Sequence, residues 1–136
     1  MKVRKINEEF LKIYYRKKKI YYEKYGVYIL LSDSYRIYKI KNDDCILDLT
    51  KFKKINLLDF LDRQDQDYIV GNITDNIIDG KIKLRKITTE DFDVYINDNY
   101  LKLFDNPIVK VRADNEPILV YENDEIVGLI LPIENY

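Results

Sequence analysis

The chain has 136 residues, of which 46% are hydrophobic and 35% charged, a composition that excludes a disordered protein and suits one globular domain over residues 1–136. Its 23 basic and 24 acidic side chains give a net charge of −1, which excludes both the basic excess of a protein that coats DNA and the strong acidity of a DNA mimic. Apolar runs are only a few residues long, so we expect no membrane-spanning segment and no membrane partner.

Few residues suited to catalysis are present. The chain has no histidine, one cysteine (Cys45) and four glycines that are too dispersed to form a phosphate-binding loop. We therefore expect a non-enzymatic protein without a cofactor or a metal ion. The alternative is a carboxylate pair, such as Asp43 with Asp44, that binds Mg²⁺. A lone cysteine and the lack of an apolar leader after Met1 favour a cytoplasmic location.

The first predicted elements are a short strand over residues 3–6 and a helix over residues 8–24. Asn7 is a good N-cap for that helix, because its side chain can accept a hydrogen bond from a free backbone N–H of the first turn. Gly26 is a natural stop, because glycine adopts the left-handed conformation that ends many helices.

A basic stripe with tyrosines at its border is the candidate binding site on this helix. The helical period places Lys12, Arg16 and Lys19 at i, i+4 and i+7, on the face opposite the apolar residues. Tyr15 and Tyr22 lie at the edge of the stripe, and tyrosine is enriched at interfaces. The stripe suits phosphate groups of DNA or RNA, or a protein partner. The plainest alternative is a solvated helix face.

From Gly26 onwards the sequence predicts mostly strands. Residues 26–31 and 35–40 flank a polar turn and predict a hairpin. A further strand is predicted over residues 45–50 and a short helix over residues 55–62. The remaining predictions are strands over residues 68–73, 81–87, 92–96, 108–113, 117–123 and 126–133, and a short helix over residues 98–106.

This order of elements predicts an α+β domain with a mostly antiparallel sheet. Asp79-Gly80 and Asn123-Asp124-Glu125 are the clearest turn signals between the later strands. Alternation within residues 81–87 places Ile87 on the solvated face. The apolar last strand has two interpretations, one at a sheet edge that could pair with another chain, the other in the middle of the sheet.

Two stretches resemble DNA sliding-clamp domains. Residues 30–40, LLSDSYRIYKI, are similar to a strand-turn-strand unit of that family, and residues 92–133 are similar to the end of a bacterial clamp. The resemblance implies two helices on one face of the sheet, where clamp helices line a ring around duplex DNA. The chain departs from the family at Ser34, where glycine is usual, and in its second predicted helix, where Lys102 is the only basic residue. The family also needs six such domains to close a ring.

These observations favour a single, diverged clamp-like domain of the type that phages and mobile elements carry, acting by binding in the host cytoplasm. The leading hypothesis is a protein that docks on nucleic-acid-processing or defence machinery. In its sharper form, the protein inhibits a host defence nuclease, as anti-CRISPR proteins do. The alternative is a self-assembling, clamp-like homo-oligomer that binds DNA through the basic stripe.

Overall fold

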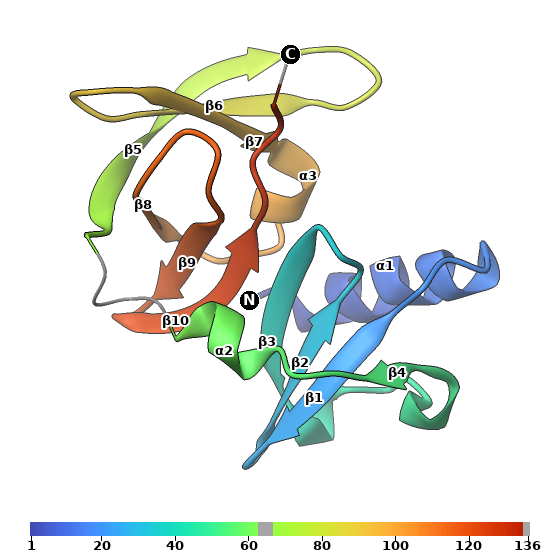
Figure 1. The fold of residues 1–136 in the computed structure, drawn as a ribbon. Helices are drawn as coiled ribbons and strands as arrows, with labels where there is room; N and C mark the ends of the chain where they lie inside the picture. Colours follow the sequence, from blue (N-terminus) through green and yellow to red (C-terminus); the bar gives the residue numbers. More distant parts are fainter. Residues whose placement is uncertain (63–66, 135–136) are drawn as a thin grey trace.

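A sheet of ten strands runs through the part of the chain that the computed structural model describes, residues 1–62 and 67–134 (Figure 1). Its order is β4-β1-β2-β3-β10-β9-β8-β5-β6-β7, and neighbours pair antiparallel except β1 and β4, which run parallel. The strands are β1 (Tyr21–Tyr25), β2 (Tyr28–Ser32), β3 (Arg36–Lys41), β4 (Lys53–Lys54), β5 (Ile69–Ile78), β6 (Leu84–Thr88), β7 (Asp93–Asn97), β8 (Ile108–Val111), β9 (Ile118–Glu122) and β10 (Glu125–Ile130). The α-helices in these ranges are α1 (Val3–Tyr15), α2 (Leu58–Leu61) and α3 (Asp98–Leu101). The predicted α+β class with a mostly antiparallel sheet is confirmed.

Helix α1 differs from the predicted helix at both ends. It begins within the segment predicted as a strand, residues 3–6, and ends at Tyr15, well before residue 24. Lys17 then takes a left-handed conformation with φ 57°, and the N–H of Lys18 donates to the carbonyl of Ile13. This is a common way to end a helix, but the left-handed position is usually occupied by glycine. A lysine there leaves no signal in the sequence, so the predicted end was wrong.

Residues 21–25, predicted to be helical, form the strand β1 instead. β1 pairs along its whole length with β2, and the hairpin closes at Tyr25 opposite Tyr28. Gly26, the predicted helix stop, occupies the first place of the two-residue loop with φ 58°, a conformation that glycine adopts without strain. The glycine signal was therefore real, but it belongs to a hairpin.

Asn7, the predicted N-cap, lies buried in the middle of α1, where its side chain links the helix to the loop after β3. Its side-chain nitrogen donates to the carbonyls of Val3 (3.1 Å) and Asp44 (2.9 Å), and its Oδ1 accepts from the N–H of Ile46 (3.1 Å). These bonds hold the loop after β3 against the helix. The strand predicted over residues 45–50 is wrong, because Ile46 at the start of this segment is hydrogen-bonded to Asn7 and the end of the segment forms a short 3₁₀ helix.

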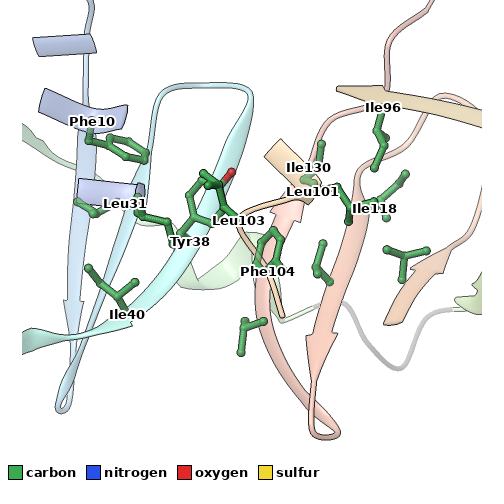
Figure 2. Packing of buried hydrophobic residues seen from close by; sticks show 14 of the residues in the cluster. Phe10, Leu31, Tyr38, Ile40, Ile96, Leu101, Leu103, Phe104, Ile118 and Ile130 are labelled. Atoms are coloured by element: carbon green, nitrogen blue, oxygen red, sulfur yellow. The ribbon is translucent and has the colours of Figure 1, made fainter. Parts of the chain in front are cut away.

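The sheet is covered on both faces. Alternation along β2 and β3 places Leu31 and Tyr38 in the cluster that contains α1 and α3 residues, and Leu30 and Ile37 in the cluster that contains α2 residues. Phe10 of α1 meets the Tyr38 ring edge-on, with ring centroids 6.1 Å apart (Figure 2). α1 and α3 thus lie on one face and α2 on the other. Within the described ranges, no helix has the length and apolarity needed to cross a bilayer.

The C-terminal half of the sheet curls back on itself (Figure 1). β5 is shared between two neighbours, because residues 69–71 pair with β8 and its later residues pair with β6. The segment after β10 runs beside β7, where the Ile133 N–H donates to the Tyr95 carbonyl at 2.8 Å. β10 itself lies between β3 and β9. The last strand therefore occupies the middle of the sheet, and the edge position is wrong.

Several local predictions are confirmed in part. The β9–β10 hairpin turns through Asn123 and Asp124, both with positive φ, as a two-residue loop of this type requires. α2 lies within its predicted range, whereas α3 is only the first turn of the helix predicted over residues 98–106. Ile87 is fully buried instead of solvated. The simple alternation predicted for residues 81–87 fails because the pairing of β6 with β5 is irregular and the sheet curls around β6.

Candidate polyanion-binding groove

The five residues singled out from the sequence do not share one helix face. Lys12 lies on α1, its ammonium 3.8 Å from a glutamate carboxylate one turn away, and Arg16 is the C-cap of the helix. Lys19 lies in the loop before β1. Tyr15 is 74% exposed, whereas Tyr22 of β1 packs partly against the core. The predicted stripe is wrong, because the helix that would align these residues ends before Lys19.

A groove lined by lysines lies at the C-terminal end of α1. Its basic side chains come from the loop after α1 and from the segment that enters β4, which lie on the same side of the molecule in Figure 1. It encloses about 670 Å³, and the described residues that line it include no carboxylate. This lysine groove is lined by Lys17, Lys18, Lys19, Lys51 and Lys53, together with Tyr14, Tyr15, Ile20, Tyr21 and Phe52.

Backbone hydrogen bonds hold the two lysine segments together. The N–H of Lys17 donates to the Tyr14 carbonyl at 2.9 Å, so the chain reverses direction directly after α1. The N–H of Lys53 donates to the Ile20 carbonyl at 3.1 Å, and β4 pairs parallel with β1 beyond that point. Two basic segments that are distant in the sequence therefore meet at a position fixed by the main chain.

Among the described residues, the lysines of the groove lack ion-pair partners, although Asp48 and Lys51 attract each other at longer range. All five are exposed, and none of their ammonium groups forms an ion pair with a carboxylate in the described ranges. Asp48 lies beside the groove, and hydrogen bonds from the hydroxyl (2.6 Å) and the N–H (3.1 Å) of Thr50 lower the pKa of its carboxyl. The groove is therefore a local positive surface on a protein whose overall charge is almost balanced.

Aromatic rings form one wall of the lysine groove. The Tyr14 ring meets the Phe52 ring at 5.9 Å in an edge-on arrangement, and the Tyr15 ring lies 5.8 Å from Tyr14. Phe52 packs against the main core, so the inner end of this wall is anchored. Tyr15 stands out into solvent at the outer end. Exposed rings beside cationic groups are the combination that binds stacked bases and phosphates.

Similarity to known proteins does not guide the interpretation of this surface. Comparisons with family models, curated proteins and solved structures find no match for the chain. The function must therefore be inferred from the geometry and charge of the described residues.

Other chemically distinctive residues point to structure rather than to a reaction. Asp98 is fully buried and pairs with Arg85 (2.8 Å) and Lys102 (3.1 Å). Burial by itself would raise the pKa of Asp98, but the bonds from these two cations outweigh it and lower that pKa. Burial raises the pKa of the Cys45 thiol, which disfavours the reactive thiolate. Within the described ranges, no three carboxylate or thiol side chains gather into a metal site.

A second, apolar hollow lies on the α2 face of the sheet. It encloses about 360 Å³. Aliphatic side chains of the second core cluster line it, among them Ile37, Leu57 and Leu129, and Arg36 and two serines add polar groups at its wall. Phe60 of α2 forms part of its wall and is 43% exposed. We call this the apolar pocket. Its size and lining are typical of sites that take a small molecule or an anchoring side chain.

Sequence reasoning found only part of the lysine groove. Lys19 and Tyr15 were singled out for a different geometry, and Lys17 and Lys18 stand in the same basic run. The Lys51-Phe52-Lys53 segment was missed, although an aromatic residue between lysines was a visible signal. No local pattern shows that this segment meets the loop after α1, because the parallel pairing of β4 with β1 depends on the whole fold.

Proposed function

We propose that this protein binds nucleic acid through the lysine groove and that it works by binding rather than by catalysis. The observation that carries the proposal is the convergence of five exposed, unpaired lysines from two segments on one groove without a lining carboxylate. A lysine that neutralises a phosphate releases a condensed counterion, which favours binding at low salt. The aromatic wall adds a surface for bases.

The balanced overall charge supports binding of nucleic acid at one local site rather than over the whole protein surface. With a net charge of −1, most of the surface offers no general attraction to a polyanion. Binding should therefore be sensitive to a few lysines and insensitive to others, which makes the proposal testable by matched substitution.

The test measures the affinity for a fluorescently labelled oligonucleotide over a series of salt concentrations. One variant combines Lys18→Glu, Lys51→Glu and Lys53→Glu in the groove. Its control combines Lys41→Glu, Lys81→Glu and Lys83→Glu, which are also exposed and change the net charge equally. We expect the groove variant to bind more weakly and its salt slope to fall by roughly 2, at about 0.7 per phosphate contact on a single strand, while the control keeps its slope. Equal losses in both variants would contradict the lysine groove as the site.

Docking on a protein of nucleic-acid-processing or defence machinery is the second candidate, and the apolar pocket favours it. A pocket of about 360 Å³ with an exposed phenylalanine in its wall can hold an anchoring side chain of a partner. The direct test adds the protein in excess to purified effector nucleases of host defence systems. Inhibition that Phe60→Asp removes, but the groove substitutions do not, would support an anti-CRISPR-like inhibitor. Unchanged cleavage by every nuclease tested would argue against it.

A clamp-like ring remains a separate proposal, based on the resemblance of residues 30–40 and 92–133. The placement of α1 and α3 on one face supports it, and the loss of the basic stripe weakens it, because Lys12 is the only one of the three bases within α1. Light scattering behind size exclusion tests it directly. A six-protomer mass would support a ring of this family's design, and a monomer of 16.4 kDa would contradict self-assembly.

A further inference from the structure

A smaller hollow lies directly beside the lysine groove, on the other side of its aromatic wall. It encloses about 300 Å³. Four residues line both the hollow and the groove, namely Tyr14, Tyr15, Lys51 and Phe52. The remaining lining residues are Leu11, Ile46, Leu47 and Asp48. We call this the side hollow. The lysine groove and the side hollow therefore share one wall, so a ligand that extends across this wall contacts both.

The side hollow differs from the groove in its chemistry. Its lining side chains are mainly aliphatic and aromatic. Two of them are largely exposed to solvent, Tyr15 at 74% and Ile46 at 73%. Its charged groups are the Asp48 carboxylate and the Lys51 ammonium. A carboxylate repels a phosphate, whereas it accepts hydrogen bonds from the amino group of a base. The side hollow thus disfavours phosphate and suits a flat, apolar group with polar edges.

The walls of the side hollow are held in place before any ligand binds. The Ile46 N–H donates to Asn7, which is 3% exposed and also holds Asp44. On the other side, the Thr50 hydroxyl and N–H both bond the Asp48 carboxylate. Because hydrogen bonds fix the main chain on both sides, little binding free energy would be spent on ordering the site.

We infer that the ligand of the lysine groove is single-stranded nucleic acid, with one base seated in the side hollow against Tyr15 and Ile46 while neighbouring phosphates meet the groove lysines. This inference rests on the proposed function and names its substrate class. A single strand can turn a base away from its neighbours and stack it on a protein ring. A duplex keeps its bases paired, so it can offer the groove phosphates but nothing to the side hollow.

The experiment compares a labelled single strand of about 12 nucleotides, of mixed sequence that includes adenine and cytosine, with a duplex of the same length, at matched salt, on the full chain. One variant combines Tyr15→Ala with Ile46→Ala. Its control combines Tyr35→Ala with Val70→Ala, which truncates a tyrosine and an aliphatic residue that are also well exposed, 59% and 64%. Because all four side chains are exposed, the variants should fold, and thermal unfolding of each checks this.

We expect the unaltered protein to bind the single strand at least roughly 10-fold more tightly than the duplex, and the side-hollow variant to lose roughly that factor on the single strand only. The salt slope should stay the same, because no lysine is removed. Equal affinity for both forms, or equal losses in the variant and its control, would overturn this inference while leaving phosphate binding by the groove intact. Equal competition by polyglutamate of similar length would overturn it too, since charge alone would then explain binding. Insensitivity to the groove lysines would instead remove the proposed function.

Discussion

The cluster around Asp98 and the lysine groove use charge in opposite ways. Asp98 is fully buried, and two cations, Arg85 and Lys102, compensate it at close range. In the groove, five lysines are gathered without a paired carboxylate in the described ranges. An unpaired buried charge costs several kcal/mol, so a charge that supports the fold must have partners. Exposed lysines cost little to leave unpaired, so those that converge without partners are free to bind a ligand.

The largest expected effect comes from breaking the buried cluster. Asp98→Ala leaves Arg85 and Lys102 without their shared carboxylate and should lower the free energy of unfolding by about 3 kcal/mol, measured by urea denaturation. Asp93→Ala is the matched control, because Asp93 is exposed and pairs with Lys86 at 3.5 Å. The control should lose less than about 1 kcal/mol. Similar losses for both variants would mean that burial does not distinguish the two pairs. Affinity for nucleic acid should be unchanged wherever Asp98→Ala is folded.

Acid should weaken the same cluster in a defined direction. The pKa of Asp98 is lowered in the folded protein, so the folded state favours the charged carboxylate. Its contribution is fully present above the unfolded value of about 4 and is lost as the pH falls through the folded pKa. Asp98→Asn cannot titrate. The stability difference between wild type and Asp98→Asn should therefore be constant near neutral pH and shrink below about pH 4. A difference that stays constant down to pH 2 would contradict this.

The smallest expected effect separates folding from binding within the lysine groove. Lys17 holds φ 57°, which glycine adopts with less strain, so Lys17→Gly should raise the free energy of unfolding by about 1 kcal/mol. It should also weaken oligonucleotide binding and lower the salt slope by roughly 0.7, because one ammonium is removed. Lys18→Gly removes the same charge without a positive φ to relieve, so it should weaken binding without any gain in stability. Parallel changes in the two variants would show that strain at Lys17 has no energetic role.

Much of the C-terminal half could be predicted, and much of the N-terminal part could not. β8, β9 and β10 match predicted strands, because alternating apolar residues and turn residues such as Asn123 and Asp124 act locally. The first helix was misplaced because its real end is a lysine and its buried Asn7 imitates an N-cap. Residues 21–25 suit a helix or a strand, and pairing with β2 decides between them.

The sequence by itself determined the α+β class, the lack of histidine chemistry and the presence of a basic, tyrosine-rich segment, because composition and short-range periodicity carry these properties. Only the tertiary structure decided which lysines lie together. Lys19 lies in the lysine groove instead of on a helix stripe, and Lys51 and Lys53 reach the same groove from a distant segment through the pairing of β4 with β1. Such a meeting depends on long-range hydrogen bonds and on the burial of α1 against the sheet, which no local pattern encodes.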